Sequence, residues 1–233
     1  MPIREGFKKL ETIKKNDFVE VEYTGMIKDS KEVFDTTSEK VAKDAGIYDK
    51  KMTYGPIVVC VGEGQLLKGL DDMLEGKSIG SYEFDLLPEN AFGKRDAKLL
   101  KIIPPKVFLK EGLKPVPGLI VSVDDARGVV KTISGGRVIV DFNHPLAGKE
   151  VIYSVKVIRF VTDPVEKISS FLNLALNLKK EAFKVEVSGE GAKVILKGKL
   201  PKEFADELSS HIVRVTGLKK VDFAFEEPTQ GKA

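Results

Sequence analysis

The sequence holds little of the chemistry on which most enzymes depend. It contains one cysteine, Cys60, so it can form no intrachain disulfide and no cysteine-based zinc cluster. Its two histidines, His144 and His211, are far apart and lack the spacing of metal ligands. It has no phosphate-binding loop, dinucleotide fingerprint or nucleophile elbow. We therefore expect neither a metal site nor a bound cofactor.

Long apolar runs are also missing. The purest run covers residues 57–61 and is too short to cross a bilayer. Residues 1–5 lack the apolar core that is typical of a signal peptide. With 42% hydrophobic and 31% charged residues, the composition is that of a globular chain, and 233 residues allow two modest domains with an insertion. We expect a cytoplasmic protein.

Charge is distributed unevenly along the chain. The net charge is only +3, but residues 94–138 contain ten basic and four acidic residues, a net +6, which leaves −3 for the remainder. A step of this size indicates a separate module inside the chain.

The first part of the chain alternates between apolar and polar residues, as β-strands do. Phe18, Val19, Val21 and Tyr23 give the clearest example. Leucines at helical spacing over residues 66–74 predict a short helix that ends near Gly76. The predicted strands cover residues 17–26, 32–35, 56–61, 82–86 and 151–158.

Residues 92–141 have a different texture. Proline pairs and glycine turns separate short stretches in which apolar residues recur with period two, as at Leu119, Val121 and Val123. We expect a small all-β unit here.

A third region opens at Asp163-Pro164, a helix cap followed by proline at the first helical position. The following residues predict the order α-β-β-α-β, which suits a small sheet with helices on one face. The first helix carries two apolar stripes, and the second carries one. The stripes are Val165, Ile168, Leu172 and Leu176, then Phe171, Leu174 and Leu178, and finally Phe204, Leu208, Ile212 and Val215.

Five short motifs along the chain are informative because of their residues and their order. They are VEYTGM at residues 21–26, FD at 34–35, GEGQLLKGL at 62–70, PENAFG at 88–93 and NHPLAG at 143–148. In this order they closely resemble the FKBP-type peptidyl-prolyl cis/trans isomerases, and the last motif is similar to the SlyD-like branch with an insert in the flap. The resemblance spans residues 17–160. Residues 163–233 lie outside it, although long archaeal members are similar in carrying a C-terminal extension.

The resemblance implies an α+β protein of three domains. Residues 1–93 and 139–162 would form the discontinuous isomerase domain, an antiparallel half-barrel sheet around a short helix. Residues 94–138 would form the all-β insert-in-flap domain, which binds unfolded chains. Residues 163–233 would form a C-terminal α+β domain.

The implied reaction is rotation about X–Pro bonds, which is slow enough to limit folding because twisting destroys amide resonance. The twisted amide is less charge-separated than the planar one, so water favours the ground state. A dry aromatic pocket removes that bias and can bind the twisted form better. No nucleophile, metal or cofactor is needed for this chemistry.

By resemblance, nine residues line the pocket, and Asp35 is the one charged member. Its carboxylate could accept a hydrogen bond from Tyr23 or orient the surroundings of the substrate carbonyl. Leu66 and Leu67 would offer a backbone clamp to the bound peptide, and Leu70 would form the floor of the proline site. Taken singly, each of the nine has an ordinary alternative as a core or turn residue. The implied catalytic residues are Tyr23, Phe34, Asp35 and Phe92, and the implied substrate-binding residues are Ile57, Leu66, Leu67, Leu70 and Tyr153.

Three positions depart from the family pattern. Leu70 replaces a common tryptophan, Ile57 a frequent phenylalanine and Phe92 a frequent tyrosine. These changes make the pocket shallower and put tight binding of macrolide inhibitors in doubt more than isomerisation. The metal-binding tail of bacterial SlyD-like proteins is missing, so no nickel role carries over.

The partners that we expect are unfolded or partly folded protein chains that contain proline. The insert is either a client-binding module or a decorative flap, and its lysines lack the aromatic residues that nucleic-acid binding favours, since Phe108 is its only aromatic. We expect the C-terminal region to form a homodimer interface, because the second stripe of its first helix, Phe171, Leu174 and Leu178, points away from the predicted sheet. This stripe could instead dock on the isomerase domain or bind clients. The rival to an enzyme is a holdase chaperone with a decayed pocket.

Overall fold

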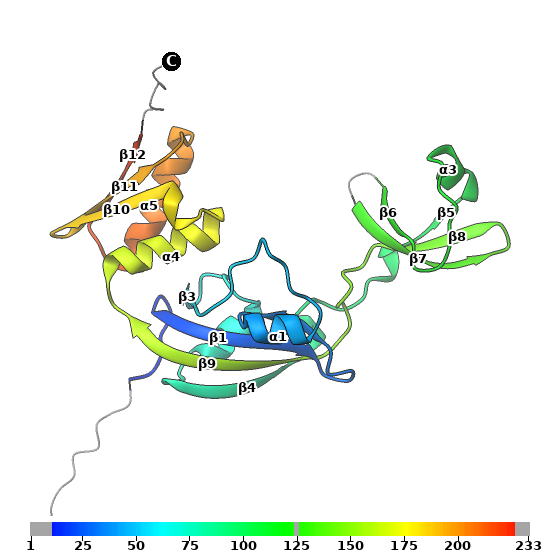
Figure 1. Ribbon diagram of the computed structural model, residues 1–233, viewed down its shortest axis with the longest axis horizontal. Coiled ribbons are helices and arrows are strands. Elements are labelled where there is room, and N and C mark those ends of the chain that lie inside the picture. Colours follow the sequence, from blue (N-terminus) through cyan, green and yellow to red (C-terminus); the bar gives the residue numbers. More distant parts are fainter. Residues whose placement is uncertain (1–10, 124–125, 227–233) are drawn as a thin grey trace, which may run out of the picture. The chain divides into compact units, whose positions relative to one another are not determined.

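The computed structural model describes residues 11–123 and 126–226 (Figure 1). Residues 1–10, 124–125 and 227–233 lie outside this part, and so do the outer ends of the predicted domains 1–93 and 163–233. The chain divides into two compact units, one made of Met1–Leu86 with Val151–Ala233 and the other of Leu87–Glu150. The second unit is wider than the predicted insert, residues 94–138, and the first unit holds the C-terminal region together with the isomerase sheet. In the described residues no helix is long and apolar enough to cross a membrane.

A five-stranded antiparallel sheet organises the first unit. Its order is β2-β1-β9-β4, and β3 pairs with the part of β1 that β2 leaves open. Its strands are β1 (Phe18–Ile27), β2 (Val33–Thr36), β3 (Ile57–Cys60), β4 (Gly80–Leu86) and β9 (Val151–Val161).

Two short helices accompany this sheet. Helix α1 (Glu39–Asp44) begins after Ser38, whose side chain caps it by accepting from the backbone N–H of Val41. Helix α2 (Lys68–Leu74) buries Leu70 and Leu74. It is shorter than the predicted helix over residues 66–74, because Leu67 has non-helical backbone angles and is its N-cap.

The second unit carries a four-stranded antiparallel sheet of order β5-β8-β7-β6. Its core gathers around Phe108 and Val140, and the buried carboxylate of Asp141 pairs with Arg95 and accepts from Asn143. Its elements are η1 (Pro88–Asn90), η2 (Ala97–Leu99), β5 (Leu100–Ile103), α3 (Pro105–Lys110), β6 (Ile120–Val123), β7 (Ala126–Ser134) and β8 (Arg137–Asp141).

Helix α3 corrects the expectation of an all-β insert. Pro105 stands at its first turn, where a missing N–H costs nothing, and Phe108 turns inward to fill the small core. Period-two patterns in the sequence predicted the strands of this unit. The helix has only six residues, too few to show a helical period in the sequence.

The C-terminal region has the predicted order α-β-β-α-β (Figure 1). Asp163 caps the first helix by accepting from the N–H of Glu166 at 3.0 Å, and Gly217 ends the second in a left-handed conformation. Strand β11 pairs antiparallel with β10 and parallel with β12. The elements are α4 (Pro164–Leu176), η3 (Lys180–Ala182), β10 (Phe183–Ser188), β11 (Gly191–Leu196), α5 (Lys202–Thr216) and β12 (Lys220–Phe225).

Two residues of the predicted helix stripes do not face the core. Val165 and Phe204 are exposed, whereas Ile168, Leu172 and Leu208 are buried. Both exposed residues lie in the first turns of their helices. Helix α4 also ends earlier than its second stripe, at Asn177, which takes a left-handed conformation.

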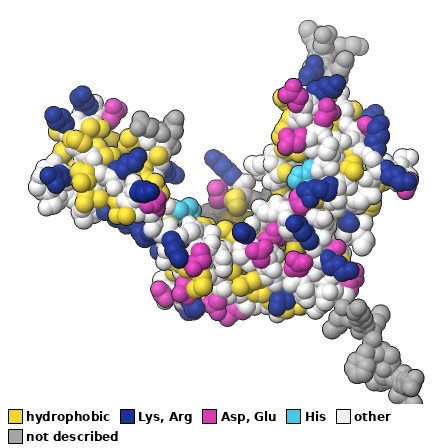
Figure 2. Space-filling model, turned by 180° about the vertical axis from the view of Figure 1, so that it is seen from behind, with side chains coloured by type: hydrophobic (Ala, Val, Ile, Leu, Met, Phe, Trp, Pro, Cys, Tyr) yellow, Lys and Arg dark blue, Asp and Glu magenta, His cyan; other side chains and the backbone are white. Residues whose placement is uncertain are grey.

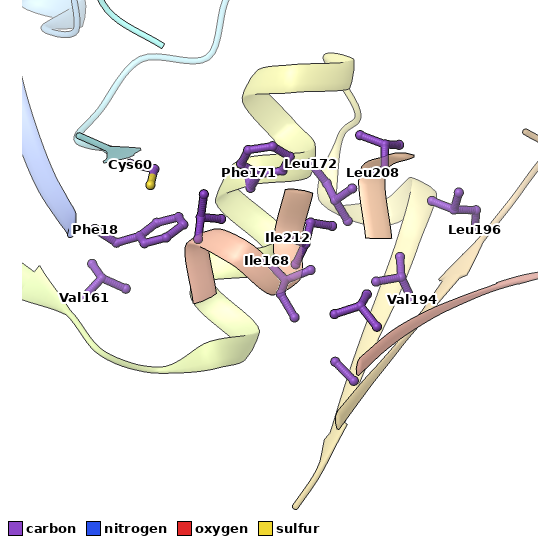
Figure 3. Close-up of a cluster of buried hydrophobic side chains, with 13 residues drawn as sticks. Phe18, Cys60, Val161, Ile168, Phe171, Leu172, Val194, Leu196, Leu208 and Ile212 are labelled. Atoms are coloured by element: carbon purple, nitrogen blue, oxygen red, sulfur yellow. The ribbon is translucent and has the colours of Figure 1, made fainter. Parts of the chain in front are cut away.

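One apolar cluster joins the isomerase sheet to the C-terminal helices within the first unit (Figure 3). Phe18 of β1, Cys60 of β3 and Val161 of β9 are buried in the same cluster as Phe171 of α4 and Ile212 of α5. Phe171 therefore packs inside the chain, where the second stripe of α4 was expected to point away. Leu178 packs against this cluster as well.

Candidate active site

The pairing of β1 with β2 brings Tyr23, Phe34 and Asp35 to one place. Two buried threonines secure the pair. The N–H of Tyr23 donates to Thr37 Oγ1 at 2.9 Å, and Thr36 Oγ1 donates to the carbonyl of Tyr23 at 3.1 Å. These bonds hold Tyr23 of β1 against the end of the strand that carries Asp35.

Tyr153 joins this group from β9. In the sheet it stands opposite Gly25 of β1 and is almost fully buried. Its ring centroid lies 5.8 Å from that of Tyr23 and 5.8 Å from that of Phe34, in tilted and edge-to-face arrangements respectively. Such geometries are favourable for aromatic pairs and make a stiff apolar wall.

Gly25 leaves the space in which these rings meet. A Cβ atom there would lie 2.9 Å from Phe34 and 2.9 Å from Tyr153, closer than side chains normally approach. The β-strand register also shifts directly after Gly25. Gly25 belongs to a motif that sequence reasoning singled out, but its role in making room was missed.

Asp35 is the charged group in this aromatic surrounding. Burial raises its pKa, against the opposing effect of a hydrogen bond from Tyr23 and of one from the backbone of Thr36. Burial also raises the pKa of Tyr23 and of Tyr153, and the nearby Asp35 carboxylate raises both further. The Tyr23 hydroxyl therefore stays protonated and donates to Asp35.

The predicted peptide clamp lies in the loop between β3 and α2. Leu66 and Leu67 are half-buried, and the carbonyl of Leu67 accepts from the N–H of Leu70 at 2.9 Å. Leu70 is fully buried in α2. Their contact with a substrate stays a prediction.

The turn before this loop is held by Asp71, which sequence reasoning missed. Its buried carboxylate accepts from the N–H of Gly62 at 3.0 Å and from that of Gly64 at 3.1 Å. The side chain of Gln65 accepts from the N–H of Cys60 at 2.7 Å. The spacing of aspartate seven and nine residues after the two glycines was the available signal.

Ile57 and Phe92 complete the set of nine. Ile57 is half-buried at the start of β3, on the wall of a groove of about 960 Å³ that residues 53–58 form with α4 and β10. Phe92 belongs to the second unit, where its ring stacks on that of His144 with centroids 4.7 Å apart. Its role at the site stays a prediction.

Comparison with known proteins bears on the whole arrangement. A family model described as FKBP-type peptidyl-prolyl cis-trans isomerase matches residues 9–110, and one described as FKBP26, IF domain matches residues 101–146. The short-type peptidyl-prolyl cis-trans isomerase of Methanocaldococcus jannaschii is 34% identical over 146 residues, which cover 62% of this chain and 92% of that protein. The chain belongs to the FKBP-type peptidyl-prolyl cis-trans isomerase family.

Two further relatives are bacterial. The probable FKBP-type 16 kDa isomerase of Pseudomonas fluorescens is 38% identical over 116 residues, or 47% of this chain and 76% of that protein. The isomerase SlyD of Pasteurella multocida is 30% identical over 133 residues, or 54% of this chain and 66% of that protein. These likenesses identify the chain as an isomerase enzyme.

The geometry suits the chemistry of an FKBP-type isomerase. Tyr23, Phe34 and Tyr153 form an apolar wall, and Asp35 is turned toward the Tyr23 hydroxyl. An amide that leaves water for such a surrounding loses the solvation that favours its planar form. That this wall binds the twisted amide better than the planar one stays a prediction.

Proposed function

We propose that this isomerase accelerates X–Pro rotation in folding protein chains and that its insert binds those chains. The convergence of Tyr23, Phe34 and Tyr153 around Asp35 carries the catalytic part of the proposal. A long unfolded chain that is held at a second place stays near the pocket, which raises its local concentration there.

Exposed apolar side chains on the insert support client binding. Ile102, Leu109 and Ile120 are 60%, 65% and 58% exposed. Figure 2 shows many hydrophobic side chains on the surface of the second unit. A small soluble domain rarely leaves so many in water without a function for them. The other exposed apolar residues of the insert are Leu99, Leu100, Val107, Leu113, Val116 and Ile133.

A cavity of about 330 Å³ in the second unit is large enough to hold one apolar side chain of a client. Ile102 and Ile139 line it together with Thr132 and Arg137. Its size is at the lower end of small-molecule sites, which suits a single side chain.

The positive charge of the insert does not favour nucleic acid as its ligand. Phe108, the only aromatic residue in 94–138, is buried in the core of the insert. It cannot stack on a base, and binding to single strands usually relies on such stacking. We infer that the lysines attract acidic stretches of client chains.

We also propose that the enzyme works in the reducing cytoplasm. The one cysteine, Cys60, is free and buried, and burial with the nearby Glu63 charge raises its pKa to about 12. With a single cysteine the chain does not use an intrachain disulfide for stability, which is typical of proteins in a reducing compartment.

Two assays with one pair of variants test the function. Ile102→Ser with Leu109→Ser changes the insert, and Ile79→Ser with Met52→Ser is a matched control at residues that are 56% and 58% exposed outside it. On a short proline peptide, all proteins should be equally active within about twofold, whereas on a proline-limited refolding protein the insert variant should lose about tenfold.

Equal refolding activity of the insert variant and the control would refute client binding by these residues. Absence of activity on the short peptide in the unaltered chain would refute the catalytic part and favour a holdase.

A further inference from the structure

Glu63 has a side chain that is buried although it lies in an exposed turn. It occupies the middle of residues 62–64, between β3 and the loop of Leu66 and Leu67, and its side chain is only 6% exposed. Its neighbours Gly62 and Gly64 are exposed. A buried carboxylate without a partner is costly, so its partners explain its position.

The partners come from α5 of the C-terminal domain. Arg214 donates to Oε1 of Glu63 at 2.8 Å through Nη1 and to Oε2 at 2.7 Å through Nη2. His211 Nε2 lies 2.5 Å from the same Oε2. This is a bidentate arginine–carboxylate pair, the strong and directional kind, and the Arg214 hydrogen bonds lower the pKa of Glu63.

An apolar contact supports the polar one. The ring of His211 lies 4.8 Å from that of Phe171, centroid to centroid. Phe171 is buried with Phe18 and Cys60 of the isomerase sheet (Figure 3). The histidine and the arginine are therefore held at the turn by the packing of both C-terminal helices.

The turn that they grip leads directly into the predicted peptide clamp. Asp71 fixes the backbone of Gly62 and Gly64 from the α2 side, and Leu66 and Leu67 follow within three residues. The turn is thus held from two sides, by α2 through its backbone and by α5 through Glu63.

We propose that His211 and Arg214 are positioning residues for isomerisation, acting through Glu63 on the turn that presents Leu66 and Leu67. This rests on the proposed function, since it assigns to the C-terminal domain a part in the same site. Loosening the grip lets the turn move, so the clamp binds the peptide less well while the aromatic wall is unchanged.

The test measures KM and kcat of the full chain on a short proline peptide. Arg214→Ala should raise KM about threefold or more with little change in kcat, because a binding element is lost and the aromatic wall is not. Glu63→Gln should do the same, and the double variant should be no worse than either single one, since both act through one contact.

Arg159→Ala is the matched control. Arg159 also bridges the sheet and α4, with Nε 2.6 Å from Glu20 and Nη1 3.1 Å from Glu166, but it does not contact the turn. It should leave KM unchanged. If Arg159→Ala raises KM as much as Arg214→Ala, the effect is general loosening and the proposal is wrong.

Amide hydrogen exchange gives a readout that does not depend on activity. In Arg214→Ala the N–H groups of Gly62 and Gly64 should exchange about tenfold faster, whereas those of β9 should not change. Unchanged protection of the turn together with an unchanged KM would overturn the proposal while the unaltered chain remains active. An unaltered chain without activity on the peptide would overturn the proposed function and this inference with it.

Discussion

Among the nine predicted pocket residues, Asp35 is the one with a carboxyl group, and its burial among aromatic rings disfavours the charged form. Burial raises its pKa, and only the Tyr23 hydroxyl and the Thr36 backbone oppose this effect. Replacing it by leucine keeps the branching of the side chain, with somewhat larger methyl groups, but removes the acceptor of Tyr23. We expect Asp35→Leu to lower kcat/KM on a proline peptide at least about tenfold while the protein stays folded.

Circular dichroism should confirm folding of that variant, and Asp29→Leu, at an exposed turn, is its control. An active Asp35→Leu protein would remove Asp35 from the site. Tyr23→Ala and Phe34→Ala should lower the activity in the same assay, because each removes a ring that packs on Tyr153.

The titration of Asp35 gives a prediction about stability. Its pKa in the folded state lies above the ordinary value of 3.8, so its contribution to stability is full below pH 3.8 and is lost as pH rises through the folded pKa. Asp35→Asn has no titrating group at this position and therefore lacks this pH-dependent contribution. The free energy of unfolding of the natural protein, relative to Asp35→Asn, should therefore fall as pH rises above 3.8. Urea unfolding at successive pH values measures the difference, and a constant difference would contradict it.

Gly25 makes the third residue-scale prediction. Gly25→Ala places a methyl group 2.9 Å from the rings of Phe34 and Tyr153, which must then separate. We expect lower kcat/KM, because the aromatic wall is displaced. Gly191→Ala is the control for the general cost of removing a glycine, since its φ is not in the left-handed region and the nearest atom would lie 3.6 Å from the added carbon, an ordinary contact. Equal activity of the two variants would contradict the assigned role of Gly25.

At the scale of elements, the turn between β3 and α2 depends on α2 for its shape. Asp71 accepts from two backbone N–H groups of the turn, so Asp71→Ala leaves both without a protein partner. We expect the free energy of unfolding to fall by about 1–3 kcal/mol. Urea unfolding measures it, and Asp72→Ala, at the exposed neighbour on the same helix, should change it little. Equal losses would show that the turn does not need Asp71.

Apolar patterns along the chain predicted the long strands better than the short helix α3. The alternation of β1 and β9 extends over 10 and 11 residues, long enough to be distinctive. Helix α3 has six residues and buries only Phe108. A single turn and a half cannot display a period of 3.6, so its presence had to come from packing.

At the scale of the whole molecule, a homodimer through the C-terminal domain stays a prediction. Its original basis was the stripe of Phe171, Leu174 and Leu178, but Phe171 and Leu178 pack in the cluster of the chain itself. Leu174 is half-buried on the wall of the groove between α4 and residues 53–58. Leu174 and the exposed Val165 and Phe204 are therefore the apolar residues of these stripes that remain available for an interface with a second copy of the chain.

We expect the full chain to sediment as a dimer at micromolar concentration and Leu174→Glu to split it, because an unpaired charge in an apolar interface is unfavourable. Ala175→Glu, exposed on the same helix, is the control. A monomeric natural protein would refute the dimer, and Leu174 would then be tested as a client-binding residue.

The sequence by itself determined the family, the α+β class, the order of the C-terminal elements and the cap at Asp163. These follow from short segments: motif residues in order, an alternating strand, or a capping side chain three residues from the N–H that it accepts. Such information is local, because the backbone conformation of a few residues depends mainly on those residues. That the predicted site is aromatic could be inferred from the sequence for the same reason.

Only the tertiary structure decided which groups meet across the chain. Glu63 and Arg214 are 151 positions apart, and nothing near either one indicates the other. The clearance at Gly25 depends on rings from β2 and β9. The second apolar stripe of α4 was expected to point away from the chain, but Phe171 and Leu178 of this stripe pack in the cluster that the isomerase sheet shares. The reason is physical: burial is non-directional, so an apolar stripe specifies that it must be covered and leaves open what covers it.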